Sequence, residues 1–334
     1  MLGLLVVFGG ALALGTWSLL ENDDDDTESD AELERQDGTS GDDSLTGGSG
    51  PDLLLGFDGN DTLEGEGGDD LLVGGGNDDS LSGGSGDDTL RAGWGDDIAR
   101  GGAGDDVIGG GDGNDILFGN AGNDTIEGND GFDVIFGGAG NDVVSGNNNG
   151  DTLLGDDGDD TLSGGVGMDF LLGGRGEDVV QGGVGADTLG GGGVIEDIFG
   201  AAESDDDPTE NELAQILDDG EADTLDGGDD DDRVYTGSGD VAMGGAGTDS
   251  FVVGTGSGYE ATTTITDFTV GEDTLVISTG TTPDDPDAAA ASFASMQTVT
   301  DDGVLFSFDD DESHDVLLAG LTEVLTAASI QVVA

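Results

Sequence analysis

The chain has no cysteine, one histidine and only five basic residues among 334. Without cysteine, neither disulfide bonds nor thiolate metal sites can hold the fold. The lone His314 excludes the two-histidine helix motif of zinc proteases and any metal site built from several histidines. All five basic residues are scattered arginines, so nucleic acid is not an expected partner, because clustered lysine and arginine are needed to neutralise its phosphates.

Acidic residues and glycine are present in large excess instead. The chain contains 77 Asp and Glu residues and 69 glycines, and its formal net charge is −72. A polyanion of this size repels itself and resists compaction unless cations neutralise it. Its carboxylates suit hard, oxygen-preferring metals rather than those that prefer imidazole or thiolate. The composition therefore predicts a chain that is either disordered or folds with bound metal.

An aspartate recurs every nine residues through the middle of the chain. The surrounding text reads G-G-x-G-x-D-x-U-x with U apolar, as in residues 83–90 and 137–144. A fixed period this short predicts a solenoid, and a carboxylate fixed within it predicts a ladder of ligands. The seventeen aspartates in register are Asp43, Asp52, Asp61, Asp70, Asp79, Asp88, Asp97, Asp106, Asp115, Asp124, Asp133, Asp142, Asp151, Asp160, Asp169, Asp178 and Asp187.

An apolar residue follows each of these aspartates by two positions. One short strand per unit with one inward side chain is a minimal core, and only Ala99 departs from the large apolar type. The residues expected in this core are Leu45, Leu54, Leu63, Leu72, Leu81, Leu90, Ile108, Leu117, Ile126, Ile135, Val144, Leu153, Leu162, Leu171, Val180 and Leu189.

The glycines of the repeat favour calcium as the metal. Glycine permits positive φ and leaves backbone carbonyls uncovered. Calcium takes six to eight oxygens from carboxylates and carbonyls in flexible geometry, whereas magnesium demands a tighter octahedron and keeps its water. A loop rich in carbonyls, with one carboxylate per unit, therefore matches calcium better than magnesium.

These residues resemble the RTX (repeats-in-toxin) calcium-binding proteins, whose nonapeptide repeat has this pattern. The resemblance implies a right-handed parallel β-roll in which two nonapeptides make one turn and each Ca²⁺ lies between the loops of units n and n+2. It implies that the seventeen aspartates are ligands, with Asp232 and Asp249 as weaker candidates. Carbonyls of loop residues would complete the sites, for example those of Gly101, Ala103, Gly138 and Gly140.

Departures from the pattern affect individual units, whereas the charge balance supports the resemblance. Asn77, Asn149 and Val194 replace the fourth glycine, and asparagine tolerates the left-handed conformation better than valine does. Residues 41–199 hold 35 acidic side chains against three arginines, a balance of −32. Eighteen loops paired as in the family would take up to about 16 Ca²⁺ ions, and we expect a number on the order of 15. Their positive charge would nearly neutralise the array.

The segments outside the array differ in composition. Residues 2–20 are uncharged and mostly apolar, which fits a membrane anchor or uncleaved export element, a signal peptide or a buried segment. Residues 21–40 are predicted to be an acidic disordered tether. The array, taken as residues 41–200, is followed by an insertion over 201–222 with Pro208 and a short helical pattern, and by degenerate units over 223–253 that include one unit a residue short.

Residues 254–334 lose the glycine repeat and are predicted to form a β-rich cap. Strands are expected over 262–265, 274–277, 304–308 and 315–318, and a short helix over 288–296. The stretch 265–275 resembles the segment that follows the repeats in secreted RTX proteases, which implies an uncleaved type I secretion signal. An ordinary strand and turn of the cap is the alternative for the same residues.

Function is predicted from the array, since little chain remains for a catalytic domain. No G-x-S-x-G, Walker loop or HExxH occurs, and His314 beside Asp315 is typical of a surface pair. We therefore expect an all-β, non-enzymatic, extracellular calcium-binding protein, secreted or surface-tethered, with a structural, adhesive or matrix role. Its expected partners are calcium, the type I secretion machinery and a surface or matrix component. A secreted hydrolase carrying the array as a folding module is the alternative.

Overall fold

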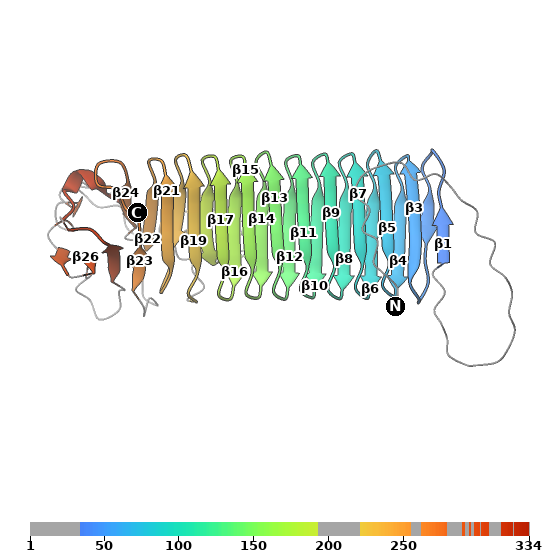
Figure 1. Ribbon diagram of the computed structural model, residues 1–334, viewed down its shortest axis with the longest axis horizontal. Coiled ribbons are helices and arrows are strands. Elements are labelled where there is room, and N and C mark those ends of the chain that lie inside the picture. The colour runs from blue at the N-terminus through green and yellow to red at the C-terminus, as the bar shows by residue number, and fades with distance from the viewer. Residues whose placement is uncertain are drawn as a thin grey trace, which may run out of the picture. The chain divides into compact units, whose positions relative to one another are not determined.

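The computed structural model describes residues 34–192, 221–254, 262–278, 289–290, 294, 297–300, 302–306, 315–322 and 324–333. All of these residues belong to one unit, residues 32–334. Its described part is an all-β parallel solenoid of about 11 turns, which confirms the predicted β-roll. The sequence produces this fold because each nonapeptide supplies one loop and one short strand (Figure 1).

Two sheets face each other across the core. The first runs in the order β1 (Glu34–Asp37), β3 (Asp52–Asp58), β5 (Leu71–Gly76), β7 (Thr89–Trp94), β9 (Val107–Asp112), β11 (Thr125–Asp130), β13 (Val143–Asn148), β15 (Thr161–Val166), β17 (Val179–Val184), β19 (Thr224–Asp229), β21 (Val241–Ala246), β23 (Thr263–Ile265), β27 (Val316–Ala319), β26 (Gly303–Phe306) and β25 (Gln297–Val299).

The second sheet runs in the order β2 (Ser44–Thr46), β4 (Thr62–Gly67), β6 (Ser80–Ser85), β8 (Ile98–Ala103), β10 (Ile116–Ala121), β12 (Val134–Ala139), β14 (Thr152–Asp157), β16 (Phe170–Arg175), β18 (Thr188–Gly192), β20 (Arg233–Thr236), β22 (Ser250–Gly254), β24 (Thr274–Ser278) and β28 (Ile330–Val333). From β1 to β24, successive strands therefore alternate between the sheets, and two nonapeptides make one turn, as predicted.

The strand register keeps identical repeat positions above one another. Leu54 of β3 pairs with Leu72 of β5, eighteen residues later, and Leu117 of β10 pairs with Ile135 of β12. Side chains at this position form one continuous core, in which Leu54 and Leu72 are fully buried and Leu45 is partly buried. Ala99 also lies in this core. The period therefore generates the core directly, because stacking places the same inward side chain in every strand.

The array continues in register past the insertion. Val179 of β17 pairs with Thr224 of β19, a separation of 45 residues in place of 18. The insertion thus adds 27 residues without disturbing the turns on either side. Glu196, which follows Asp187 by nine residues, lies outside the described residues, and Asp223 stands at the next register position of the ladder after Asp178.

The C-terminal part continues the solenoid and then changes direction. Strands β23 and β24 add to the two sheets in parallel, whereas β25, β26 and β27 pair antiparallel with one another. The four strands expected here are present as β23, β24, β26 and β27, and the predicted helix is described only at Ala289 and Ala290. A short 3-10 helix, η1 (Ala327–Ser329), precedes β28.

Of the N-terminal segments, the structure describes only the end of the predicted tether. Strand β1 places residues 34–37 in the first sheet, inside the stretch expected to be a tether, because pairing with β3 uses backbone groups and needs no apolar side chain. Residues 2–20 lie outside the described residues. Within the described part of the chain, no helix is long and apolar enough to span a bilayer.

Candidate metal centre

The repeat aspartates form a buried ladder, which we call the inner ladder. Each aspartate lies where a loop enters a strand, and those from Asp52 to Asp187 are at most 3 % exposed. The backbone N–H of one aspartate donates to Oδ1 of the aspartate eighteen residues later, at 2.8 Å from Asp88 to Asp106 and 2.7 Å from Asp142 to Asp160. The Oδ1 atom of an aspartate therefore links its own turn to the preceding turn by a hydrogen bond.

The inner ladder has two branches, one at each edge of the solenoid. One contains Asp43, Asp61, Asp79, Asp97, Asp115, Asp133, Asp151, Asp169, Asp187, Asp232, Asp249 and Asp273. The other contains Asp52, Asp70, Asp88, Asp106, Asp124, Asp142, Asp160, Asp178, Asp223 and Asp240. The structure thus brings all seventeen predicted aspartates, with Asp232 and Asp249, into the two branches.

Three members were missed as candidate ligands: Asp223, Asp240 and Asp273. Residues 223–225 and 273–275 read D-T-L, as residues 61–63 do, so this local text was the available signal for two of them. Asp240 ends a unit one residue short, and the ladder separation from Asp223 to Asp240 is 17 residues. The short unit expected after residue 223 is therefore confirmed.

The second carboxylate oxygen has no hydrogen-bond partner through most of the ladder. These Oδ2 atoms are buried, although an ionised carboxylate without a partner in a protein interior is strongly unfavourable. They belong to Asp61, Asp70, Asp79, Asp88, Asp97, Asp106, Asp115, Asp124, Asp133, Asp142, Asp151, Asp160, Asp169, Asp187 and Asp232. Buried acceptors of this kind, repeated at one place in every unit, indicate a missing cationic partner.

Most Oδ2 atoms of the inner ladder border a small space beside the first glycine of their unit, which we call the cradle. The point where a Cβ on Gly182 would stand lies 2.6 Å from Oδ2 of Asp187 and 2.5 Å from the carbonyl oxygen of Gly227, the first glycine of the next turn. At Gly38 the corresponding distances are 2.9 Å to Asp43 and 2.6 Å to the carbonyl oxygen of Gly56. A carboxylate and a carbonyl thus converge at distances close to the roughly 2.3–2.6 Å of Ca²⁺–oxygen bonds.

The cradle also explains why glycine occupies the first position. A Cβ there meets the carboxylate more closely than real Cβ atoms approach other atoms, as at Gly56 and Gly137. The fourth and second positions need glycine for a different reason, since Gly140 and Gly138 have φ of 131° and 116°. Asn77 and Asn149 adopt φ of 76° and 73° at the fourth position, which confirms that asparagine is tolerated there; Val194 lies outside the described residues.

The four carbonyl residues predicted as ligands have different surroundings. The carbonyl oxygen of Gly101 borders the cradle of Asp88, 2.7 Å from the Cβ position of Gly83. The carbonyl oxygen of Ala103 accepts a hydrogen bond from the Gly86 N–H at 2.8 Å.

In the other unit named at the sequence level, the carbonyl oxygen of Gly140 faces the backbone of Gly158 one turn later. Gly138 occupies the second position, and it is Gly137 whose carbonyl borders a cradle, that of Asp124. First-position carbonyls are therefore the better candidates, and the assignment of these residues as ligands stays a prediction.

Burial changes the acidity of the inner ladder. For eleven of these carboxyls, desolvation raises the pKa, neighbouring carboxylates raise it further, and the backbone hydrogen bond to Oδ1 opposes the rise. The pKa reaches about 7 at Asp79, Asp106, Asp115, Asp142, Asp151 and Asp232. It reaches about 6 at Asp88, Asp97, Asp133, Asp160 and Asp187. The metal-free fold thus favours protonated carboxyls, whose protons a bound cation would displace.

The ends of the ladder are satisfied by the protein itself. Oδ2 of Asp43 accepts the Thr39 N–H at 2.6 Å, and Oδ2 of Asp52 accepts the Gly48 N–H at 2.6 Å. At the other end, Oδ2 of Asp240 accepts the Gly237 N–H and Oδ2 of Asp273 accepts the Thr269 N–H, each at 2.6 Å. The unpartnered oxygens are therefore a property of the interior turns.

The donor set fits calcium. The described residues contain no group of three or more acidic or histidine side chains that could hold a metal ion together, so a metal site here has to draw on backbone carbonyls. A buried carboxylate with adjacent carbonyls is an all-oxygen set of the type that Ca²⁺ accepts. The cradle's carboxylate and carbonyl, Oδ2 of Asp187 and the Gly227 oxygen in the example above, are the groups that would hold the ion.

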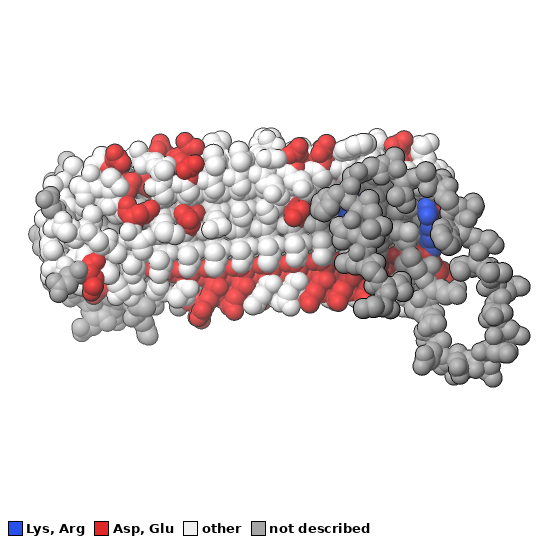
Figure 2. All heavy atoms as spheres, in the orientation of Figure 1, with Lys and Arg blue, Asp and Glu red and all other residues white. Residues whose placement is uncertain are grey.

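A second, exposed ladder lies outside the first. At the fifth position of many units, an N–H donates to the Asp or Asn side chain eighteen residues earlier, at 2.9 Å from Asp105 to Asp87 and 3.0 Å from Phe132 to Asn114. This outer ladder runs in the opposite direction to the inner one. Figure 2 shows a row of acidic side chains along one loop edge of the face in view.

Comparison with known proteins agrees with this geometry. The family model of the RTX calcium-binding nonapeptide repeat matches residues 37–193 in overlapping segments and residues 215–241, which together are more than half of the chain. No curated protein matches the chain. The register, the oxygen-lined cradles and this match lead to one conclusion: the chain belongs to the family of RTX calcium-binding repeat proteins.

Proposed function

We propose that Ca²⁺ binds in the cradles and that its binding folds the array. The unpartnered Oδ2 atoms carry this proposal. Each buried unpaired carboxylate costs several kcal/mol, whereas the stability of a whole domain is only about 5–15 kcal/mol. Fifteen such groups therefore exceed what the core can offset at neutral pH without a ligand, so folding and ion binding become one coupled event.

We propose that this event takes place outside the cell. Extracellular calcium reaches the range of about 10⁻⁴ to 10⁻³ M at which weak protein sites fill, and cytosolic calcium does not. The chain would leave the cell unfolded, through a type I secretion system that reads its C-terminal region, and would fold on arrival. Secreted and surface-tethered forms are both consistent with the apolar residues 2–20.

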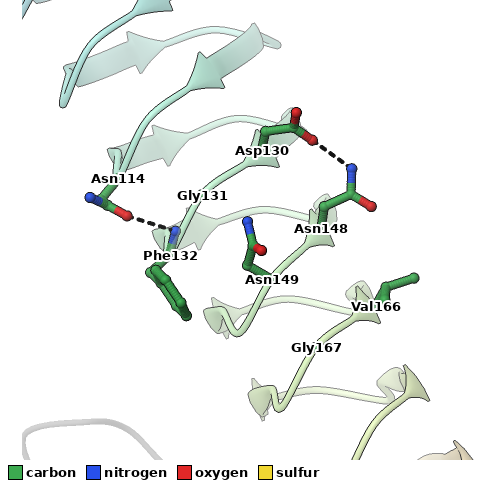
Figure 3. Close-up of a pocket in the computed structure, with 8 residues that line it drawn as sticks. All are labelled: Asn114, Asp130, Gly131, Phe132, Asn148, Asn149, Val166 and Gly167. Atoms are coloured by element: carbon green, nitrogen blue, oxygen red, sulfur yellow. Dashed lines mark hydrogen bonds between the residues drawn. The ribbon is translucent and has the colours of Figure 1, made fainter.

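The folded array would serve a structural, adhesive or matrix-forming role. Its loop edge carries exposed apolar side chains, with Phe132 66 %, Val166 52 % and Met168 74 % exposed. Phe132 and Val166 lie beside a shallow hollow of about 670 Å³ lined by Asn114, Asp130 and Asn148 (Figure 3). The Asn148 amide donates to Asp130 at 2.6 Å and so is held in place. An exposed apolar surface with ordered polar neighbours favours contact with another component, here a surface or matrix molecule.

Circular dichroism during a calcium titration tests the central step. The calcium-free chain should gain β signal as Ca²⁺ rises toward the millimolar range, and the same concentration of Mg²⁺ should produce little change. Removing the ion with a chelator should reverse the gain. The proposal is contradicted if the β signal does not change with calcium, or if it changes equally with Ca²⁺ and Mg²⁺.

A further inference from the structure

The first position of the repeat has one exception to glycine. Between residues 38 and 191 every ninth residue at this position is glycine except Ala92. Ala92 belongs to the unit of Asp97, is fully buried, and lies in β7. Its side chain therefore stands inside the array and not on the surface.

The methyl group of Ala92 occupies a place that the other units leave open. At the equivalent glycines, a Cβ would stand between the Oδ2 of the aspartate five residues later and a first-position carbonyl oxygen of the next turn, as at Gly128 with Asp133 and Gly146. A methyl carbon offers no lone pair to a cation, and it fills space that the cation needs. In the unit of Asp97 the cradle is therefore filled by the protein.

We propose that the array contains one permanent gap: the Ala92 methyl closes the cradle of Asp97, so this cradle takes no Ca²⁺. The inference rests on the proposed function, because it assumes that the remaining cradles bind calcium. It concerns ion stoichiometry, and it makes Ala92 the residue that removes one site from an otherwise regular branch.

The gap is confined to one cradle. The carbonyl oxygen of Ala92 still borders the preceding cradle, 2.6 Å from the Cβ position of Gly74, where Asp79 supplies the carboxylate. Oδ1 of Asp97 still accepts the Asp79 N–H at 2.6 Å. Backbone stacking and the inner ladder thus continue through the unit, and only the space beside its Oδ2 is lost.

The same unit is weakened in its core. Ala99 supplies the inward side chain where neighbouring turns have Leu81 and Leu117, so this strand buries less apolar surface. In a solenoid, coupling passes only between adjacent turns. The proposed gap thus lies in a unit that also buries less apolar surface than its neighbours.

Ala92→Gly and Gly128→Ala test the gap as a matched pair. Both positions lie on the same branch of the inner ladder, and neither Gly128 nor its equivalents at the first position need positive φ. Calcium bound per chain at saturation is measured by equilibrium dialysis with atomic emission, and circular dichroism checks the fold. Ala92→Gly should bind one ion more than the wild-type protein, and Gly128→Ala one ion fewer.

The outcomes separate the two proposals. A wild-type protein that binds no calcium contradicts the proposed function. A wild-type protein that binds calcium, with Ala92→Gly binding the same number of ions, overturns the gap while leaving the proposed function standing. Because Ala92→Gly restores the repeat pattern, it is not expected to unfold, so it decides the question even if Gly128→Ala fails to fold.

Discussion

Replacing Asp160 by asparagine separates the role of the inner ladder from that of the outer one. Asp160 is 1 % exposed, its Oδ1 accepts the Asp142 N–H at 2.7 Å, and its Oδ2 has no hydrogen-bond partner. The adjacent Asp159 is exposed, and its Oδ1 accepts the Glu177 N–H at 3.0 Å. Asp160→Asn and Asp159→Asn therefore remove one charge each from neighbouring positions of one loop, but only the first removes a cradle carboxylate.

The expected magnitude depends on how many ions bind together. Removing one partner of a buried charge pair costs about 3–5 kcal/mol in the loaded protein. By linkage, this cost is shared among all ions of one cooperative transition. A loss of about 4 kcal/mol raises the calcium midpoint roughly 1.5-fold if about 16 ions bind as one block, and roughly fivefold if a block holds about four. The size of the shift thus measures the length of the folding block.

The assay is the calcium midpoint of the β signal in circular dichroism for the wild-type protein and both variants. Asp159→Asn should leave the midpoint within experimental error, because an exposed carboxylate loses little when neutralised. Equal midpoints for Asp160→Asn and Asp159→Asn would refute the assignment of Oδ2 as a calcium ligand. A larger shift for Asp159→Asn would place the ion on the outer ladder instead.

Three further predictions concern protons, the core and the insertion. Burial raises the pKa of inner-ladder carboxyls such as Asp79 and Asp106 to about 7, above the ordinary 3.8, so the stability of the calcium-free fold should be greatest below pH 4 and be lost as pH rises through about 6–7. Lowering the pH of the calcium-free chain toward 4 should therefore raise its β signal in circular dichroism, and a spectrum that does not change contradicts this. Leu153→Ala, at a fully buried core position, should lower the stability of the calcium-loaded protein by about 2–5 kcal/mol, seen in chemical denaturation, with the partly exposed Thr152→Ala as the near-neutral control. Deleting residues 193–219 should restore the eighteen-residue register between β17 and β19 and keep the calcium-induced β signal; loss of that signal would show that the insertion is needed for folding.

The solenoid could be predicted well because the nine-residue period of the sequence directly determines which side chains stack in the core. A residue that recurs every nine positions must stack once two units make a turn, so the pairing of Leu54 with Leu72 follows from the repeat alone. The same reasoning failed after residue 190, where the insertion breaks the count. The separation of 45 residues between Asp178 and Asp223 follows from stacking across the insertion, and a fixed period cannot anticipate it. The unit one residue short, which gives the separation of 17 residues from Asp223 to Asp240, was visible in the sequence.

The metal centre was predictable only at the level of residue type. The pattern identified the aspartates, but which carboxylate oxygen binds the chain and which faces the cradle depends on side-chain geometry that the sequence does not contain. For the same reason the predicted carbonyls included Ala103, whose oxygen accepts a backbone hydrogen bond, and omitted Gly137, whose oxygen borders a cradle. The importance of Ala92 likewise depends on the structure. From the sequence, glycine at the first position indicates only conformational freedom. The structure shows that a Cβ at this position would lie between the carboxylate and the carbonyl of a cradle, in the space proposed for an ion.

The ends of the ladder differ from its interior turns in the group that satisfies the second carboxylate oxygen. In an interior turn the residue four before the aspartate lies within a paired strand, as Gly84 of β6 does opposite Gly102 of β8. Thr39 and Gly48 lie beyond the last residues of β1 and β2, and their N–H groups donate to Oδ2 of the aspartate four residues later. A strand that ends early thus frees a backbone donor that compensates the carboxylate without a metal. Under the proposed function, the number of ions would therefore be set by the turns that lie between these self-satisfied ends, less the turn whose cradle is proposed to be filled by Ala92.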